Sequence, residues 1–310
     1  MEEKIEIMNL LQSKQVLEHE LQSLAYGSVE IRENESNKYI YVHYREDGVV
    51  LTKYVGEYSD ELYNLVLNNS IKAKQLKKQI REITKKLKQL NYTEEELSEK
   101  VEQNIDFAKR HLVDTIYKQA ILEGVATTFA DTESIIEGGK VNNMTSEDIL
   151  KIVNLKHAWE FILNKNVILS DTNFALLCQI NKMVEEGFYY TAGKVRNTPV
   201  TIGGTTWKPD LPIESVIKEE LEEIFSKELD DIDRAIELLL YTMKKQIFID
   251  GNKRTAVIYS NHYLISKGKG IIAIPAELTE EFKDLLISYY EGKVEKQIKK
   301  FVKEKCYMSI

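Results

Sequence analysis

Residues Gln246 to Val257 read QIFIDGNKRTAV, which places one acid, one glycine, one amide and two cations in five consecutive positions. The segment before it, DIDRAIELLLYTMKK, and the segment after it, RTAVIYSNHYLISKGKG, both have the apolar spacing of helices. QIFIDGNK therefore connects two helices, and Asp-Gly-Asn at 250–252 is a turn composition. We expect the second helix to begin near Lys253.

This loop has the composition of an anion site. The start of a helix presents unpaired backbone N–H groups and the positive end of the helix dipole, and Lys253 and Arg254 add two formal charges. Gly251 lets a phosphate approach the backbone, and Asn252 can cap the helix or close the loop. Asp250 fits such a site if a divalent cation bridges its carboxylate to a polyphosphate, as Mg²⁺ commonly does. The residues indicate a nucleotide with its metal; a capped turn with incidental charge is the alternative.

The composition is that of a mainly α-helical protein without membrane segments. The 310 residues carry 42 lysines and arginines against 50 acids, a net charge of −8, so no general positive field attracts nucleic acid or anionic lipid. Only four prolines and 14 glycines interrupt the helical periodicity. Cys178 and Cys306 form neither a metal spacing nor a disulfide framework. The start, MEEKIEIMNLLQ, is acidic where a signal peptide is basic, and no apolar run approaches the roughly 18 residues that span a bilayer. We expect a cytoplasmic protein.

We expect three parts along the chain. Residues 1–57 predict an amphipathic helix followed by a three-stranded β-meander in SVEIRE, KYIYVHYR and VVLTKYVG. Residues 58–122 predict a coiled-coil-like arm, in which a long helix starts at the candidate N-cap Ser59, runs to about Leu90, and is followed by a second helix that returns along it. Residues 123–310 predict a domain of shorter helices.

The long helix has an apolar seam and a basic surface. Its apolar residues alternate steps of four and three, as in a coiled coil or a helical hairpin: Leu76, Ile80, Ile83, Leu87 and Leu90. Eight cations, with Glu82 as the single acid, lie between Lys72 and Lys88. We interpret this charge as a solvated polar face, because no aromatic residue interleaves it; a nucleic-acid contact is the alternative. The seam also allows a homo-oligomer to form through the arm.

One connection in the last part differs from the others. TAGKVRNTPVTIGGTTWKPDLP, Thr191 to Pro212, contains glycine, proline and β-branched residues and predicts a short β-hairpin between helices. Helices are expected to resume at Ile213 and Asp231.

Three motifs together resemble the Fic (Fido) family. The family's loop is His-x-Phe-x-Asp/Glu-Gly-Asn-Gly/Lys-Arg-x-x-Arg, and the matching residues are Phe248, Asp250, Gly251, Asn252, Lys253 and Arg254. GKVRNTPVTIGG, Gly193 to Gly204, resembles the family's flap hairpin, and ESIIEGG, Glu133 to Gly139, resembles its autoinhibitory helix. The motifs occur in the family's order, and the resemblance covers about Gly124 to Tyr290.

The resemblance implies a Fic-type helical domain that binds ATP or another nucleotide with Mg²⁺. It implies transfer of part of that nucleotide, usually AMP, to a Ser, Thr or Tyr hydroxyl of a target protein. Asp250 would bind the metal, and Glu137 would be the inhibitory glutamate. The phosphate-binding positions would be Gly251, Asn252, Lys253 and Arg254. The flap positions that dock the target backbone would be Thr201, Ile202, Gly203 and Gly204.

Two positions depart from the family's pattern. Gln246 stands where the family has the histidine that deprotonates the target hydroxyl; an amide can orient a hydroxyl but has no proton-accepting pKa near neutrality. His262 lies roughly 12 Å along the same helix from Arg254 and is too remote to replace that base. Val257 stands where many members have a second arginine, which weakens the usual reason for Glu137 to block nucleotide binding.

Three functions therefore stay open. The first is a divergent enzyme that transfers AMP with reduced activity, since a lost base typically costs on the order of 10²- to 10⁴-fold. The second is a catalytically inactive pseudoenzyme that binds nucleotide or a target protein. The third is a phosphotransferase toxin similar to the Doc branch, indicated by Lys253 in place of glycine. Intact residues 250–254 favour nucleotide binding in the first two, and Gln246 favours the second.

Overall fold

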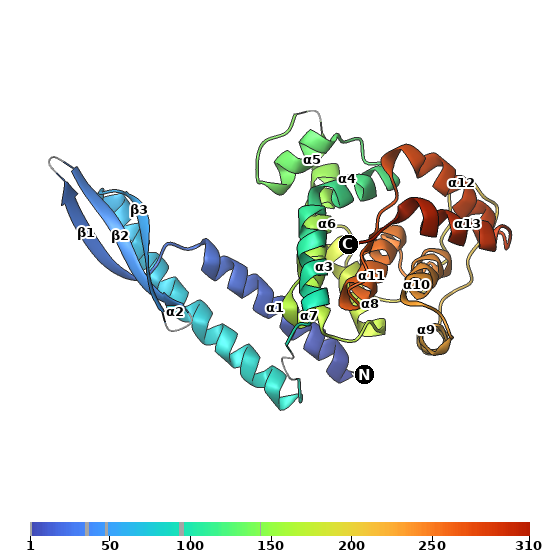
Figure 1. Cartoon of the computed structure of the whole chain (residues 1–310), viewed down its shortest axis with the longest axis horizontal. Helices are drawn as coiled ribbons and strands as arrows, with labels where there is room; N and C mark the ends of the chain where they lie inside the picture. Colours follow the sequence, from blue (N-terminus) through green and yellow to red (C-terminus); the bar gives the residue numbers. More distant parts are fainter. Residues whose placement is uncertain (1, 35–36, 47–48, 93–95, 143) are drawn as a thin grey trace. The chain divides into compact units, whose positions relative to one another are not determined.

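The computed structural model describes residues 2–34, 37–46, 49–92, 96–142 and 144–310. They are mainly α-helical with a small antiparallel sheet, which confirms the mainly α fold class (Figure 1). The chain divides into two compact units, which we call the smaller unit (Asn9–Thr93) and the larger unit (Met1–Met8 with Glu94–Ile310). Among the described helices none is both long enough and apolar enough to traverse a bilayer.

The smaller unit contains the expected meander. Its strands β1 (Ser28–Asn34), β2 (Asn37–Glu46) and β3 (Val49–Glu57) are antiparallel and pair in the order β1-β2-β3. Alternation along β2 turns Ile40 and Val42 to the same face, where both are fully buried.

That buried face packs on the long helix α2 (Asp60–Gln89), whose Val66 is also fully buried in the same cluster. The helix begins at the expected N-cap, because the side chain of Ser59 accepts a hydrogen bond from the backbone N–H of Leu62. Its seam is partly buried, with Leu76 and Leu87 nearly inaccessible.

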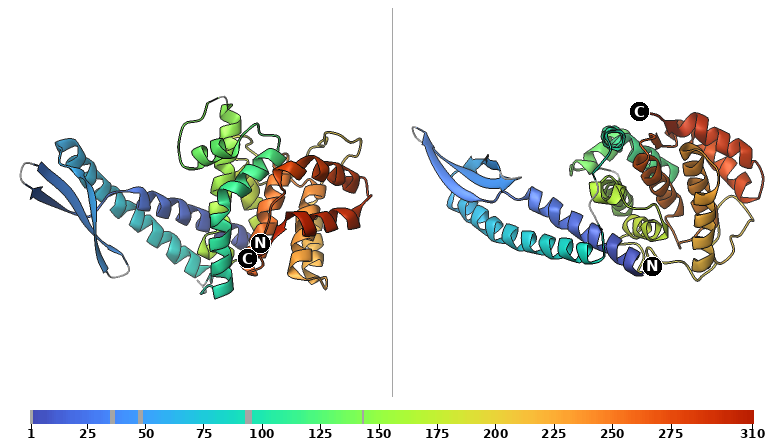
Figure 2. Two further views of the ribbon diagram at one scale, coloured as in Figure 1. Left: turned by 45° about the horizontal axis from the view of Figure 1, so that its top comes forward. Right: turned by 60° about the horizontal axis from the view of Figure 1, so that its bottom comes forward.

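Helix α1 (Glu2–Ser23) lies beside α2 over its residues 9–23, and the two run in opposite directions (Figures 1 and 2). Lys72 on α2 forms an ion pair of 2.6 Å with Glu20 on α1. Inside the smaller unit, the helix that lies beside α2 is therefore α1. The helices that follow residue 96 belong to the larger unit. The sequence analysis placed the boundary between the helical arm and the last domain at residue 122.

The larger unit consists of helices with two very short strands. In chain order its elements are α3 (Glu99–Arg110), α4 (Leu112–Leu122), α5 (Phe129–Ile136), α6 (Ser146–Ile162), α7 (Lys165–Ile168), α8 (Phe174–Val184), α9 (Glu214–Ser226), α10 (Asp231–Lys245), α11 (Asn252–Ser266), β4 (Ile271–Ile272), η1 (Ala276–Leu278), α12 (Thr279–Tyr290), α13 (Glu295–Phe301), η2 (Val302–Cys306) and β5 (Tyr307–Met308). The helices expected at Ile213 and Asp231 begin at residues 214 and 231.

Helix α11 is the central helix of this unit. It packs against α10, α8, α6 and α3, and all its residues from Arg254 to Ile265 are buried. A helix enclosed on every side needs internal partners for its polar groups. Asn261 accordingly donates hydrogen bonds to the carbonyls of Val257 and Ile272. The enclosure fixes the first turn of α11, which carries the chemistry-bearing residues.

His262 is engaged in packing between helices. It is fully buried, its Nδ1 lies 2.8 Å from the Thr172 hydroxyl and its Nε2 lies 2.8 Å from the Val167 carbonyl. Burial lowers its pKa to about 4, so it is neutral at pH 7. Both cysteines are free, and burial raises the pKa of the Cys178 and Cys306 thiols to about 12.

The connection from Thr191 to Pro212 differs from the expectation of a β-hairpin. It contains turns but no strand residues. The cause is Arg196, which is 3% exposed and whose guanidinium donates to the carbonyls of Thr198 (2.8 Å) and Asp210 (2.7 Å). These carbonyls bond to a side chain instead of to a partner strand. We call residues 196–210, which Arg196 closes, the flap loop.

Arg196 also ties the flap loop to the rest of the unit. Its Nε donates to the Gln246 carbonyl at 2.6 Å, and its backbone N–H donates to the Ile247 carbonyl at 2.9 Å. Burial lowers the pKa of this guanidinium. The flap loop and the start of the loop between α10 and α11 are therefore held at a fixed separation.

We expect Arg196→Lys to lower the free energy of unfolding by about 2–4 kcal/mol, because one ammonium cannot reach three carbonyls that lie in different directions. Urea denaturation would measure this. Arg110→Lys, at an exposed arginine of α3 with a single bond to the Asp106 carbonyl, is the matched control and should change stability by less than about 0.5 kcal/mol. If the two variants lost the same free energy of unfolding, the three buried carbonyl contacts of Arg196 would contribute no more to stability than the single exposed contact of Arg110.

Candidate functional site

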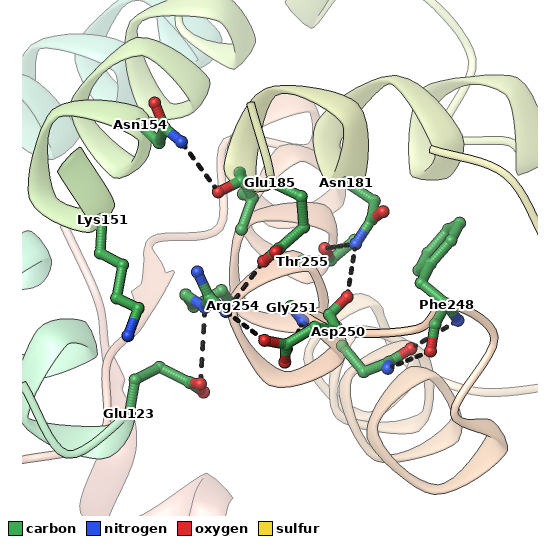
Figure 3. Close-up of polar contacts among 12 residues, drawn as sticks. Glu123, Lys151, Asn154, Asn181, Glu185, Phe248, Asp250, Gly251, Arg254 and Thr255 are labelled. Carbon is green, nitrogen blue, oxygen red and sulfur yellow. Dashed lines mark hydrogen bonds and ion pairs between the residues drawn. The ribbon is translucent and has the colours of Figure 1, made fainter. Parts of the chain in front are cut away.

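Four helix ends meet at the loop between α10 and α11. Glu123, Glu185 and Gln246 are the C-cap residues of α4, α8 and α10, and Gly251 is the N-cap of α11. The side chains of Glu123 and Glu185 point toward Arg254 in the first turn of α11 (Figure 3). The site therefore combines residues that are separated by more than 120 positions in the sequence.

Arg254 lies at the centre of the site and is surrounded by carboxylates. Its side chain is only 3% exposed, and its Nη2 lies 2.8 Å from Glu185 Oε1 and 3.5 Å from Asp250 Oδ2 (Figure 3). Its Nε lies 3.4 Å from Glu123 Oε2, and Lys253 Nζ lies 3.5 Å from the other oxygen of Glu123. In the described part of the chain neither Nε nor Nη1 of Arg254 has a hydrogen-bond partner. The guanidinium therefore has three acidic neighbours and two nitrogen atoms that make no hydrogen bond.

Glu185 is the most deeply buried of these carboxylates, with a side chain 2% exposed. Burial raises its pKa to about 7; Arg254 opposes the rise, while the charges of Asp250 and Glu123 add to it. Its Oε1 also lies against Gly251, where an added Cβ would come within 2.3 Å of it. Gly251 is further required by its φ of 73°, in the left-handed region. Only glycine therefore fits between the loop and Glu185.

Asn252 braces the loop through its side chain. Its Oδ1 accepts from the Phe248 N–H at 3.0 Å, and its Nδ2 donates to the Phe248 carbonyl at 2.8 Å. Phe248 itself is buried and anchors the loop in the core. Of the two roles that the sequence allowed for Asn252, the geometry matches closing the loop, because the N-cap is Gly251.

Gln246 is committed to internal hydrogen bonds. It is half-buried and adopts a left-handed backbone conformation, with φ 49°, which is uncommon outside glycine. Its Nε2 donates to the Met243 carbonyl at 2.6 Å, and its Oε1 accepts from Asn252 Nδ2 at 3.3 Å. The amide thus terminates α10 and joins the loop brace.

A cavity of about 320 Å³ lies beside these residues. Its lining residues are Glu123, Thr201, Ile202, Gly203, Gln246, Asp250, Asn252, Lys253, Lys283, Leu286, Ile287 and Tyr290. It brings together the loop and the flap loop, as the motifs implied. Gly204, Gly251 and Arg254 do not line it, and Arg254 lies behind the carboxylates.

Glu137 lies elsewhere. It is an exposed C-cap residue of α5 and takes part in none of the ion pairs among the described residues. Glu123, whose side chain is 12% exposed, makes the contacts to Lys253 and Arg254 instead. The sequence offered a signal for it, since Glu123-Gly124 repeats the Glu-Gly pair of Glu137-Gly138 at the end of an earlier helix.

Asn181 on α8 is a further residue that sequence reasoning missed. Its Nδ2 donates to the Asp250 carbonyl at 3.0 Å and to the Thr255 hydroxyl at 3.1 Å, and its Oδ1 accepts from the Gly193 N–H at 2.9 Å (Figure 3). It therefore joins α8, the loop, α11 and the start of the flap motif. A lone asparagine in an apolar helix gives no such indication in the sequence.

The donor set suits a magnesium ion that is bound mainly by phosphate. Within the described residues, no group of three acidic, histidine or cysteine side chains is arranged to hold a metal. Asp250 is 51% exposed, and its Oδ1 accepts from the Gly251 N–H at 2.7 Å. Since Mg²⁺ commonly uses one or two carboxylates with phosphate and water oxygens, Asp250 fits that requirement.

We expect Glu185→Gln to change how stability depends on pH. The folded-state pKa of about 7 exceeds the ordinary value of 4.5, so the folded state keeps a proton that the unfolded state has lost. This stabilisation is complete below the ordinary pKa and is lost as the pH rises through the folded one. Relative to the variant, the wild-type free energy of unfolding should fall by about 1–3 kcal/mol between about pH 4 and pH 8.

Urea titrations at a series of pH values would measure this difference. Glu186→Gln, at the exposed neighbouring glutamate, is the matched control and should run parallel to the wild type. A parallel curve for Glu185→Gln as well would contradict the raised pKa.

Comparison with known proteins agrees with this geometry. Residues 171–264, which include α8, the flap loop, the loop between α10 and α11, and most of α11, match the model of the Fic/DOC family. No curated protein matches the sequence.

Two solved structures are similar in fold. Amino acids 134–508 of Fic-1 from C. elegans share 17% identity with this chain, with a TM-score of 0.53 over 79% of this chain and 73% of that one. A Fic domain containing signaling protein from Bacteroides thetaiotaomicron VPI-5482 shares 18% identity, with a TM-score of 0.51 over 61% of this chain and 75% of that one. Over residues 171–264 the chain therefore carries a domain of the Fic/DOC family and has the Fic fold.

Proposed function

We propose that the larger unit binds ATP with Mg²⁺ beside the flap loop and transfers AMP slowly to a Ser, Thr or Tyr hydroxyl of a target protein. The observation that carries the proposal is the cavity itself. It joins Asp250, Asn252 and Lys253 to the exposed flap residues Thr201 and Gly203, so a phosphate and a target backbone can lie side by side.

The loop supplies the groups that would hold the phosphates. The first N–H groups of α11 have no partner within the helix and lie at the positive end of its dipole. Lys253 adds a charge that reaches the cavity, and Asn252 lines the cavity beside it at the start of α11. Asp250 would hold the Mg²⁺, which when bound neutralises phosphate charge that builds up during transfer.

Glu123 opposes this binding. Its carboxylate lines the same cavity and already contacts Lys253 and Arg254, the cations that a phosphate would need. A phosphate and a carboxylate at the same cations repel each other, since like charges at close range disfavour one another. We infer that Glu123, rather than Glu137, is the inhibitory carboxylate of this chain. It would act without the family's second arginine, because Val257 occupies that position.

Gln246 sets the rate. It cannot accept a proton, its Nε2 donates to the Met243 carbonyl and its Oε1 accepts from Asn252, so it offers no base to the acceptor hydroxyl and its amide is already engaged within the protein. This engagement favours a second candidate, a nucleotide-binding pseudoenzyme that signals through binding alone. Transfer that relies on positioning and electrostatics without the base would be slower by about 10²- to 10⁴-fold.

Label transfer from ATP to protein in a host-cell lysate would test the proposed function. We expect weak incorporation from α-labelled ATP with Mg²⁺ by the native chain, a rise of about 10²-fold or more in Gln246→His, and loss in Asp250→Ala. Incorporation from γ-labelled ATP instead would favour phosphate transfer. Label in Gln246→His alone would favour the pseudoenzyme, and no label in either chain would contradict the nucleotide site.

We expect Glu123→Gln to tighten ATP binding by about tenfold, because the substitution keeps the shape of the side chain and removes one charge near Lys253. Isothermal titration calorimetry with Mg²⁺ and ATP would measure it. Glu137→Gln is the matched control and should leave the dissociation constant unchanged. An equal gain in the two variants would point to a general charge effect and against an inhibitory Glu123.

A further inference from the structure

Helix α12 forms one wall of the cavity beside the loop between α10 and α11. The residues of α12 that line the cavity are Lys283, Leu286, Ile287 and Tyr290. Their spacing of three, four and seven positions from the first places them on one face of the helix. Leu286 and Tyr290 are buried, and Ile287 is half-buried. Among the described residues of this wall, Lys283 alone carries a charge.

The flap loop packs on the C-terminal half of α12. The Trp207 ring stacks on the Tyr290 ring, with 5.4 Å between centroids and 24° between planes. Gly204 lies against Ile287, where an added Cβ would come within 2.8 Å of the Cδ1 atom. Lys283 lies two turns before Tyr290, roughly 10 Å along the helix axis. These contacts hold α12 against the flap loop, so Lys283 has a defined place beside the cavity.

The charges that line the cavity are two cations and two acids: Lys253, Lys283, Glu123 and Asp250. Lys253 lies 3.5 Å from Glu123, whose side chain is 12% exposed. Lys283 lies 3.2 Å from Glu280, whose side chain is 88% exposed. An ion pair to so exposed a partner is weak, because water and salt screen it. Lys283 is therefore the cavity cation whose charge is least compensated within the protein.

Helix α11 supplies little positive charge to the cavity. Arg254 does not line it, and three carboxylates already surround its guanidinium. Val257 is buried and uncharged at the position of the family's second arginine. Of the described α11 cations, Lys253 alone lines the cavity, and Glu123 opposes it. A polyphosphate in this cavity therefore needs a cation from another element.

We propose that Lys283 on α12 binds the polyphosphate of the nucleotide and supplies the cation that α11 lacks at Val257. This inference rests on the proposed function, because it concerns the nucleotide that binds in the same cavity. A lysine suits this role, since its ammonium has three donors and its flexible four-carbon stem lets it follow a phosphate. Hydrogen bonds from an ammonium to an anion are roughly twice as strong as neutral ones, so the phosphates are favoured over the base and the ribose.

Isothermal titration calorimetry of the full chain with Mg²⁺ and either ATP or AMP tests this role. We expect Lys283→Gln to weaken ATP binding by about tenfold or more, because a charge-assisted contact to the phosphates is lost. The loss should be smaller for AMP, which carries a single phosphate. Lys283→Arg keeps the charge and should stay within about threefold of the native chain.

Lys300→Gln is the matched control. Lys300 of α13 also pairs with a glutamate of its own helical segment, Glu304 at 3.8 Å, and it lies outside the cavity. Its side chain is 72% exposed, so the substitution removes the same charge without touching the site. We expect an unchanged dissociation constant for ATP. Circular dichroism would check that each variant is folded.

The outcomes separate this inference from the proposed function. A native chain that binds no ATP would contradict the proposed function and this inference together. A native chain that binds ATP with the same affinity as Lys283→Gln would overturn this inference alone. Equal losses for ATP and AMP would assign the contact to the nucleoside part and would also overturn it. An equal loss in Lys300→Gln would show a general effect of net charge, against a contact at Lys283.

Discussion

The site depends on one buried interaction, the contact of Arg254 with the carboxylates of Glu185, Asp250 and Glu123. These acids come from the ends of α8 and α4 and from the loop, so a single guanidinium joins three otherwise separate segments. A buried arginine without partners would cost several kcal/mol, and the same holds for a buried carboxylate without a cation. Each partner is therefore needed to hold the others, and Gly251 must be glycine because Glu185 occupies the space of a side chain.

A second buried arginine sets the other wall of the cavity. Arg196 bonds to backbone carbonyls, not to carboxylates, and these belong to both ends of the flap loop and to Gln246. The guanidinium suits this task because its donors point in several fixed directions at once. Arg254 fixes the wall of the cavity that carries Asp250 and Lys253, Arg196 fixes the wall that carries the flap loop, and the loop from Gln246 to Gly251 lies between them. In the proposed function, these two arginines would set the separation of phosphate and acceptor.

The same arrangement suggests how nucleotide binding and transfer would be limited at this site. The cations that attract a phosphate are in contact with Glu123, and the residue in the place of the family's base is bonded within the protein. In the proposed function, both features would lower activity by ordinary electrostatics and hydrogen bonding, without any distortion of the fold. Transfer would then be controlled by what displaces Glu123 and by what brings a base or a target to Gln246.

The sequence by itself determined the mainly α class, the meander, the N-cap at Ser59, and the loop that joins two helices, the second of which begins beside Lys253. These follow from local periodicity, capping chemistry and a contiguous motif, all of which are written in neighbouring residues. Only the tertiary structure decided that Glu123 and not Glu137 faces Lys253, that Glu185 and Asn181 belong to the site, and that Arg196 replaces strand pairing in the flap loop. The physical reason is that contacts such as Arg196 to Gln246 and Glu123 to Arg254 span 50 and 131 positions of sequence, where packing of whole helices, rather than any local pattern, decides which side chains meet.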